Sequence, residues 1–273
     1  MIDAQKSAEQ IAAAGKINAT TYLTTVPAEY NAARCILEQY SGIAPADVDA
    51  HIIAIRDKAW DVFPYGCIGS FGFLNLEPTV QDPLFQTVAA RLRASGATET
   101  FLDVGCCLGV VVRQLIADGV SSERLYGTDL QPNFLDLGKE LFRDGNPDRR
   151  GATFIAGDML WDGDNGAALN QLNGKIDVIY AASFFHLFEW EDQLKVAKRM
   201  VGFLRSANPN TLIFGRNGGP KIVGWENYVL DSKRWHRIWD EVSKATSILW
   251  RTEIEVEDSE TWIIVMFRVF RAR

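Results

Sequence analysis

The stretch from Phe101 to Gly109 constrains the fold of this chain more than any other. It reads Phe-Leu-Asp-Val-Gly-Cys-Cys-Leu-Gly, in which an apolar run containing an acid leads into a loop of small residues. An amphipathic run from Val110 to Ile116 follows directly. This order predicts a strand, a tight turn and a helix, the arrangement that places a ligand at a helix N-terminus beside the carboxyl end of a strand.

A second acid lies where a nucleoside-binding site needs one. Asp129 closes the strand-like run Leu125–Asp129, and a carboxylate that binds ribose hydroxyls is expected about 20 residues beyond such a loop. The turn and the acid together indicate a nucleoside-containing ligand. The alternative is an ordinary strand, turn and helix with a structural glycine.

The loop disfavours a dinucleotide as that ligand. The dinucleotide fingerprint G-x-G-x-x-G needs its second glycine for backbone approach to a pyrophosphate and its third for close packing of helix on strand. Counted from Gly105, these two positions hold Cys107 and Val110. NAD and FAD are therefore disfavoured, and a nicotinamide dehydrogenase is the more remote alternative.

The rest of the chain alternates between predicted strands and helices. Short apolar runs bounded by turn residues predict buried parallel strands, and they cover 153–159, 176–182 and 211–216. Predicted helices cover 133–142, 191–204 and 232–246. This alternation implies an α/β fold with helices on both faces of a parallel sheet. The last two runs, 250–256 and 261–271, lie close enough for a hairpin and predict an antiparallel final pair.

The first 97 residues contain little that resembles a strand. Amphipathic helices are predicted over 28–40, 46–62 and 83–95. Between them, the segment from Phe63 to Leu74 is rich in aromatic residues and glycines and too irregular for a helix. It could line an apolar small-molecule pocket or plug the space between helices and sheet. We therefore expect a helical cap or substrate lid over 1–97 and a core domain over 98–273.

Composition limits the function classes. The apolar fraction of 47% is that of a globular protein, and the net charge of −7 disfavours nucleic acid as a partner. The apolar run from Trp262 to Phe267 is far too short to span a bilayer. The N-terminus lacks the pattern of a secretory signal, so Asn18-Ala-Thr20 is a coincidental glycosylation match. The sequence predicts a soluble, cytoplasmic protein without a membrane partner.

The cysteines and histidines do not predict a metal site. No C-x-x-C pair or metal-ligand spacing occurs among the four cysteines and three histidines. These residues are Cys35, Cys67, Cys106, Cys107, His51, His186 and His236. Cys106 and Cys107 lie near a predicted helix N-terminus, which could lower a thiol pKa. A role as small, loop-filling side chains is the preferred interpretation.

The loop resembles motif I of the class I S-adenosylmethionine-dependent methyltransferases, D-x-G-x-G-x-G. Asp103, Gly105 and Gly109 match the motif, and Cys107 replaces its middle glycine. S-adenosylmethionine has no pyrophosphate, so a small side chain is easier to accommodate there. The resemblance implies a Rossmann-like, doubly wound sheet of seven strands with an antiparallel last strand. It further implies these cofactor-binding residues: Asp103, Gly105, Cys106, Cys107 and Gly109 in the first motif, Asp129 and Leu130 at the ribose, Asp158 and Met159 at the adenine, and Ala181 on the central strand.

Several strings outside the loop resemble a narrower group, the small fungal methyltransferases from polyketide and meroterpenoid gene clusters. They include Ile55-Arg-Asp-Lys-Ala-Trp60, Cys67-Ile-Gly69, Leu137-Gly-Lys-Glu-Leu-Phe142, Phe185-His-Leu-Phe188 and Trp235-His-Arg-Ile-Trp-Asp-Glu241, together with the doubled cysteine. The resemblance implies methylation of a carboxyl group of a secondary metabolite, and homodimers occur in some members. The segment 218–224 departs from the group's pattern, so acceptor contacts are not assigned there.

Methyl transfer limits the choice of catalytic residues. It is an in-line displacement that needs alignment and exclusion of water. A carboxylate acceptor is already ionised, whereas a phenol with a pKa near 10 would benefit from a base. His186 follows the central strand and could be that base, a cationic donor to a carboxylate, or a structural residue. Arg216 could pair with a carboxylate or lie at the surface.

The expected acceptor is an aromatic or polyketide-derived small molecule. Its predicted contacts are Phe71, Phe185, His186, Trp235 and His236, with packing of an amphipathic helix as the alternative for His236. The sequence thus predicts O-methylation of a carboxylic acid to its methyl ester. A phenol O-methyltransferase with His186 as base and a non-catalytic S-adenosylmethionine-binding protein are the alternatives.

Overall fold

The computed structural model of the chain describes residues 22–145, 151–161, 163–220 and 231–272. The glycosylation match at 18–20 and the divergent residues 221–224 lie outside the described residues. Seven strands form one sheet in the order β3-β2-β1-β4-β5-β7-β6. They are β1 (Phe101–Val104), β2 (Leu125–Asp129), β3 (Thr153–Ala156), β4 (Val178–Tyr180), β5 (Leu212–Pro220), β6 (Trp250–Asp258) and β7 (Trp262–Arg271).

The strand pairing follows the predicted pattern. β2 pairs with β3, β1 with β4 and β4 with β5, all in parallel. β7 runs antiparallel to both β5 and β6, so the last strand of the chain is inserted between two earlier ones. The predicted seven-stranded, Rossmann-like sheet with an antiparallel last strand is confirmed.

The contacts divide the chain into two compact units. The first contains Met1–Glu99 and Cys106–Ala156, and the second contains Thr100–Gly105 and Gly157–Arg273. The N-terminal helices therefore share a unit with β2, β3 and their helices. The division of the chain into domains at residue 97 stays a prediction.

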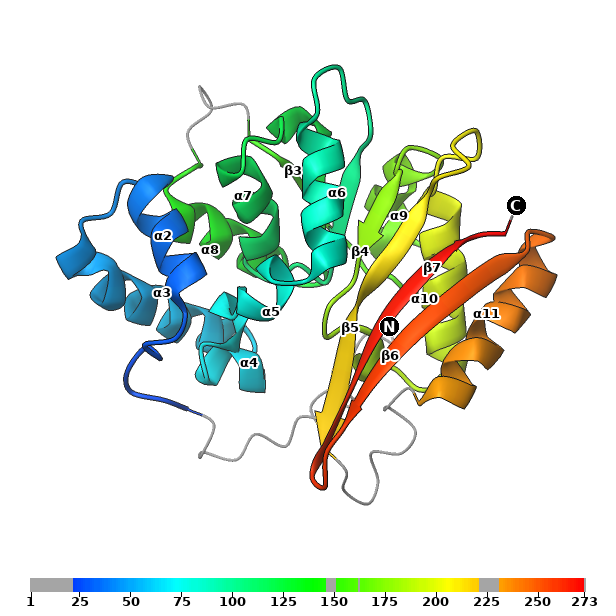
Figure 1. The fold of residues 1–273 in the computed structure, drawn as a ribbon. Coiled ribbons are helices and arrows are strands. Elements are labelled where there is room, and N and C mark those ends of the chain that lie inside the picture. The colour runs from blue at the N-terminus through cyan, green and yellow to red at the C-terminus, as the bar shows by residue number, and fades with distance from the viewer. Residues whose placement is uncertain (1–21, 146–150, 162, 221–230, 273) are drawn as a thin grey trace. The chain divides into compact units, whose positions relative to one another are not determined.

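The first unit is mainly helical (Figure 1). Two of its helices begin with proline at the first position, where the missing N–H costs nothing. One of them, Pro83–Arg93, is also capped by Asp82, whose Oδ1 accepts from the Leu84 N–H at 2.8 Å. The helices are α2 (Asn31–Gln39), α3 (Val48–Val62), α4 (Gly66–Gly69), α5 (Glu77–Val80), α6 (Pro83–Arg93), α7 (Val110–Ala117) and α8 (Pro132–Phe142).

The aromatic segment after α3 is more regular than we predicted. It contains the single turn α4 and a 3₁₀ turn over Gly72–Leu74. Ile68, Phe71 and Leu74 follow one another at a spacing of three residues, and all three are fully buried. The expectation of an irregular segment was wrong, because burial of this apolar stripe outweighs the low helix propensity of the glycines.

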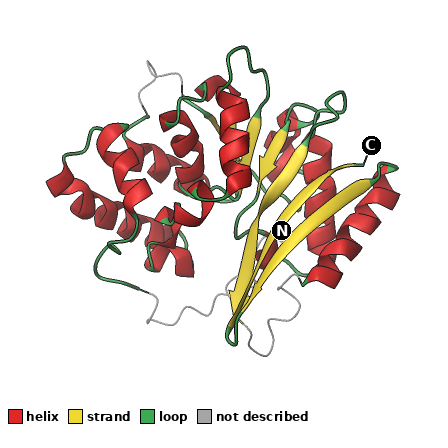
Figure 2. Cartoon of the chain, in the orientation of Figure 1, coloured by secondary structure: helices red, strands yellow, loops and turns green. Residues whose placement is uncertain are grey.

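The second unit places two long helices beside β5, β6 and β7. α10 (Trp190–Phe203) and α11 (Ser232–Thr246) lie side by side on the same side of these strands (Figure 2). A shorter helix, α9 (Asp164–Ala167), follows β3 along the chain. α11 has the predicted bounds and buries Trp235, Ile238, Trp239 and Val242, the spacing of one helical face.

Candidate functional site

The glycine-rich turn has the backbone geometry that its motif demands. Cys107 and Gly109 both have positive φ, +52° and +69°. The Cys106 N–H donates to the Thr128 carbonyl at 2.9 Å, and the Gly109 N–H donates to the Cys106 carbonyl at 2.7 Å. Cys107 therefore adopts the left-handed conformation that glycine adopts most easily, at the position where the motif has its middle glycine.

Gly109 has a second reason to be glycine. A Cβ atom there would lie 2.6 Å from Nη1 of Arg113 and 2.6 Å from Cε1 of Phe154. Arg113 is buried and hydrogen-bonded to the turn, which limits how far its guanidinium can move. The close approach of these side chains and the positive φ together favour glycine at this position.

The Asp129 side chain is hydrogen-bonded directly to this turn. Its Oδ2 accepts from the Cys107 N–H at 2.8 Å, and its Oδ1 accepts from the Gln131 N–H at 3.0 Å. Burial raises the pKa of this half-buried carboxyl, against the opposing effect of the backbone donors of Gln131 and Cys107. Each oxygen keeps a lone pair for another donor. The structure thus brings together two of the predicted cofactor residues, and Leu130 beside them is exposed.

Tyr65 and Cys67 lie near Asp129, although neither was among the predicted site residues. The Tyr65 ring centroid lies 6.0 Å from that of Phe134. Burial raises the pKa of the Tyr65 phenol, and the nearby Asp129 charge raises it further. No spacing signal in the sequence links these residues to a turn some 40 positions away. Only the fold of the N-terminal helices brings them there.

The thiols near the turn stay protonated at neutral pH. Desolvation by the surrounding protein, with a further contribution from Asp129, raises the pKa of Cys67 to about 11, although the residue keeps exposed surface. Burial also raises the pKa of Cys107 well above its ordinary value, assisted by Cys67 and Asp129. A helix N-terminus can lower a thiol pKa, but at Cys107 the net shift is upward, which disfavours a reactive thiolate.

In the second unit, the predicted cofactor residues Asp103 and Gly105 lie on and just after β1, and Ala181 directly follows β4. Asp103 is buried and pairs in register with Tyr180 of β4. Ala181 is fully buried, and its N–H donates to the Phe214 carbonyl at 2.9 Å. The ring of Phe184 lies over Gly105, where a Cβ would come within 2.5 Å of Phe184 Cδ2. Phe184 is thus a further reason for glycine at this motif position.

The loop with Asp158 and Met159 is held by an arginine that the sequence did not reveal. Asp158 Oδ1 accepts from the Leu160 N–H at 2.8 Å, and Met159 is buried. Arg199 of α10 donates from Nη1 to the Asp158 carbonyl at 2.9 Å and from Nη2 to the Gly166 carbonyl at 2.7 Å. The backbone of this loop is therefore anchored to a helix.

His186 has a defined proton arrangement. Asn217 Oδ1 accepts from the His186 backbone N–H at 3.3 Å and lies 3.1 Å from His186 Nδ1. Because that oxygen is an acceptor, Nδ1 carries the proton and Nε2 has the lone pair in the neutral ring. Burial lowers the pKa of His186, and the Asn217 bond opposes this only partly.

Three of the predicted acceptor contacts lie in the protein core. The side chains of Phe71, Phe185 and Trp235 have no exposed surface. Phe71 packs beneath the Arg56 guanidinium, whose carbon lies 4.2 Å from the ring centroid. Phe185 meets Trp235 edge to face at 5.2 Å. Packing in the core is sufficient to explain why these three positions hold aromatic residues. Their contact with an acceptor stays a prediction.

The acceptor candidate His236 and the catalytic candidate Arg216 both keep exposed surface. His236 is exposed, with Nδ1 2.7 Å from the Ser232 carbonyl one helical turn earlier. Arg216 is half-buried on β5, in register with Met266 of β7. Among the described residues, no three His, Cys, Asp or Glu side chains are grouped so that they could hold a metal ion. No helix in the described ranges has the length and apolar character needed to cross a membrane.

Comparison with known proteins identifies the family. A methyltransferase-domain model matches residues 101–207, and the model of the meroterpenoid methyltransferase N-terminal domain matches residues 21–74. The fold also resembles the plantazolicin methyltransferase BamL solved with S-adenosylhomocysteine, with a TM-score of 0.52, 14% identity, and coverage of 84% of this chain and 99% of that one. The fold and the turn define a class I S-adenosylmethionine-dependent methyltransferase.

Closer relatives narrow this class. The O-methyltransferase phiE of Fungal sp. (strain ATCC 74256) is 41% identical, over 83% of this chain and 76% of the relative. The Asnovolin E/Chermesin D methyltransferase nvfJ of Aspergillus novofumigatus is 37% identical, over 78% of this chain and 77% of the relative. The chain belongs to the fungal O-methyltransferases of meroterpenoid and polyketide type, whose methyl donor is S-adenosylmethionine. The expected enzyme class, family and cofactor are confirmed, and the non-catalytic alternative is set aside.

Proposed function

We propose that this enzyme transfers a methyl group to the carboxylate of a small secondary metabolite and forms its methyl ester. The observation that carries the cofactor assignment is the bond between Asp129 and the Cys107 N–H, because it joins the glycine-rich turn and the ribose-binding acid into one rigid element. In this proposal Asp129 and Leu130 bind the ribose, and Asp158 and Met159 contact the adenine. Ala181 lies at the end of the central strand. The methionine end is held by the residues of the first motif, which are Asp103, Gly105, Cys106, Cys107 and Gly109.

The carboxylate acceptor has support from chemistry, and the names of the relatives are compatible with it. A carboxylate is ionised at neutral pH and attacks without a base. The relative nvfJ is named for methylation of Asnovolin E and Chermesin D, and we expect an acceptor of comparable size. The cofactor supplies an electrophilic methyl group, and the protein's task is to align the attacking oxygen and exclude water.

His186 can donate a hydrogen bond to an acceptor carboxylate only after its ring has gained a second proton. Its Nδ1–H is already committed to Asn217, and Nε2 of the neutral ring has no proton to donate. A bound carboxylate would draw a proton onto Nε2, because an adjacent opposite charge favours the cationic ring. The resulting imidazolium would hold the acceptor oxygen by a charge-assisted hydrogen bond. Arg216 is the second candidate cation for this carboxylate.

The protonation of His186 at Nδ1 is also compatible with a phenol as the acceptor. A neutral His186 with a free Nε2 lone pair is the state that accepts a proton from a phenol. In that case the proton moves from the phenol oxygen to Nε2 as the new bond to carbon forms. Where His186 takes part, a phenol acceptor therefore needs its neutral ring, whereas a carboxylate acceptor is held by its cation.

The two acceptors predict opposite pH profiles. After a panel of acids and phenols has been screened for release of S-adenosylhomocysteine, kcat/KM of the best acceptor is measured between about pH 5.5 and 8.5. For a carboxylate, kcat/KM should fall about tenfold per pH unit above the pKa of His186. A profile that instead rises with pH and then levels off would contradict the carboxylate proposal and favour the phenol. Mass spectrometry of the product identifies the methylated atom.

The homodimer and the cytoplasmic location also remain proposals. They rest on the resemblance to the fungal group and on composition. Light scattering of the purified enzyme at several concentrations tests the first, and a mass equal to that of one chain throughout would contradict it. Localisation of a tagged full-length chain tests the second.

A further inference from the structure

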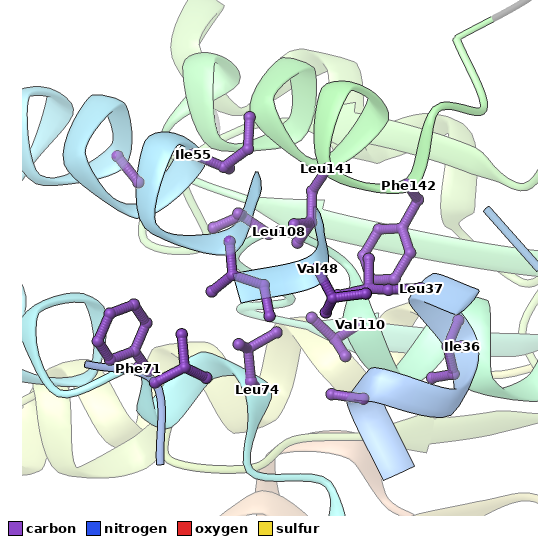
Figure 3. Close-up of a cluster of buried hydrophobic side chains, with 14 of the residues drawn as sticks. Ile36, Leu37, Val48, Ile55, Phe71, Leu74, Leu108, Val110, Leu141 and Phe142 are labelled. Atoms are coloured by element: carbon purple, nitrogen blue, oxygen red, sulfur yellow. The ribbon is translucent and has the colours of Figure 1, made fainter. Parts of the chain in front are cut away.

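The N-terminal helices pack directly on the glycine-rich turn. Leu108 of the turn and Val110 of α7 are buried in one apolar cluster with Ile36, Leu37 and Val48 from α2 and α3 (Figure 3). Among the described residues, all members of the cluster belong to the first unit. The region we expected to be a substrate lid is therefore also a support for the cofactor turn.

A buried arginine holds the carbonyl side of this turn. Arg113, with 1% of its side chain exposed, donates from Nη1 to the Leu108 carbonyl at 2.8 Å and to the Gly109 carbonyl at 3.3 Å. The C=O and N–H groups of one peptide plane point in opposite directions. Anchoring the Gly109 carbonyl thus fixes the direction of the Val110 N–H, the first of the unpaired donors of α7.

Asp144 neutralises and orients this arginine. Its two oxygens accept from Nε at 2.8 Å and from Nη2 at 2.9 Å, a bidentate pair. Only 7% of the Asp144 side chain is exposed. The rings of Phe142 and Phe154 lie 4.7 Å and 4.6 Å from the guanidinium carbon. The guanidinium has little freedom to adopt another position.

Tyr40 connects this pair to the N-terminal region. It caps the C-terminus of α2, and its hydroxyl donates to Asp144 Oδ2 at 3.1 Å. A chain of hydrogen bonds therefore leads from α2 through Asp144 and Arg113 to the backbone of the turn. We call Tyr40, Asp144 and Arg113 the turn anchor.

We propose that the turn anchor is a positioning network that sets the affinity for S-adenosylmethionine, so that α2 contributes to cofactor binding through Tyr40 and the backbone of the turn. This inference rests on the proposal that the turn holds the methionine end. The anchor residues are positioning residues, because they act through the backbone of Leu108 and Gly109.

Three variants of graded severity test the turn anchor. Arg113→Lys loses the bidentate pair, Asp144→Asn loses one charge, and Tyr40→Phe loses one hydrogen bond. Calorimetric titration with S-adenosylmethionine and with S-adenosylhomocysteine should show Kd raised by about tenfold or more in the first two, since each loses charge-assisted bonds. Tyr40→Phe should raise Kd by about two- to fivefold, the effect of one ordinary hydrogen bond.

Arg124→Lys is the matched control. Arg124 also donates to two backbone carbonyls of the first unit, those of Glu99 at 3.0 Å and Leu92 at 2.6 Å, but it lies before β2, away from the turn. This variant should lower the Tm yet leave Kd within about twofold of the parent, because only fold stability is affected. Tyr40→Phe removes no buried charge, so we expect this variant to fold. It therefore still tests the turn anchor if Arg113→Lys does not fold.

Two results would overturn the inference. One is an unchanged Kd for both ligands in folded Tyr40→Phe and Asp144→Asn proteins. The other is an equal rise of Kd in the Arg124→Lys control. Asp129→Ala separates this failure from failure of the cofactor assignment, because it should weaken binding even if the anchor plays no part.

Discussion

Asp129 shows how one side chain can link two motifs that are separate in the sequence. Its two oxygens receive the N–H groups of Cys107 and Gln131, so the acid orients the turn before a ligand arrives. Preorganised groups of this kind reduce the cost of ordering on binding. The remaining lone pairs are available to two neighbouring hydroxyl groups, as a ribose offers.

We expect Asp129→Ala to weaken S-adenosylmethionine binding by about 1.5–3 kcal/mol, the range for hydrogen bonds to a charged group. Calorimetric titration measures this change directly. Asp136→Ala on α8 is the control, since that acid is largely exposed and pairs with Lys139 one turn away. An affinity equal to that of the parent enzyme would remove Asp129 from the cofactor site.

His186→Gln is the sharpest residue-level test of the acceptor. Glutamine can donate a hydrogen bond but does not titrate. Burial lowers the pKa of His186, so with a carboxylate acceptor the parent enzyme should lose kcat/KM as pH rises above that lowered pKa. The variant should have a lower and flat profile. Loss of all activity at neutral pH, with recovery only in alkali, would instead indicate a base for a phenol.

Individual site residues differ in how far the sequence could predict them. The turn, Asp129 and His186 could be found because each lies at the end of a predicted strand or shortly after it. Asn217 could not, because it lies 31 positions beyond His186 and meets it only through the pairing of β4 with β5. Phe71 and Trp235 look like pocket aromatics in the sequence, yet core packing holds both.

At the scale of elements, α8 lies unusually close to the turn through Gly138. A Cβ atom there would come within 2.4 Å of the Leu108 carbonyl oxygen, which is backbone and has little room to move. Gly202 of α10 is a contrasting case, since a Cβ there would have no neighbour within 4 Å. Gly138 lies within α8 and Gly202 in the last turn of α10, and alanine has the higher helix propensity.

We therefore predict opposite effects for the same substitution at these two sites. Gly138→Ala should lower the free energy of unfolding by about 1–3 kcal/mol through overpacking. Gly202→Ala should raise it by about 0.5–1 kcal/mol, because helix propensity is the main change. Denaturation by urea measures both. A neutral or stabilising Gly138→Ala would mean that α8 can move away from the turn.

Secondary structure was predictable where the apolar pattern was strong. α11 has the predicted bounds, and β2 ends at the predicted acid. The single turns α4, α5 and α9 escaped prediction, because four-residue helices leave no periodic signal. The insertion of β7 between β5 and β6 followed only from family resemblance, since the hairpin pattern alone does not give strand order.

At the scale of the whole chain, the N-terminal helices and the first half of the core share one apolar cluster. The cluster joins Ile36, Leu37, Val48 and Ile52 to Leu108 and other residues beyond the predicted boundary at 97. Each fully buried side chain of this size is worth about 1.5–3 kcal/mol. Burial of several such side chains therefore contributes as much free energy as the net free energy of unfolding of a typical domain, about 5–15 kcal/mol.

A fragment containing residues 98–273 alone should therefore fail to fold. We expect no cooperative thermal transition by circular dichroism and no heat of binding with S-adenosylmethionine. The full-length chain under the same conditions is the control. A fragment that unfolds cooperatively and binds the cofactor as the full chain does would show that the helical region is a separate domain.

A crystal structure of the enzyme with S-adenosylhomocysteine tests the assignment of Asp129 and the turn to the cofactor site. We predict that both ribose hydroxyls lie about 2.5–2.7 Å from the Asp129 carboxylate oxygens, the range for bonds from a hydroxyl to a charged acceptor. The amino acid end should lie against the turn from Gly105 to Gly109. A bound ligand whose ribose is remote from Asp129, with its amino acid end away from the turn, would contradict the central claim.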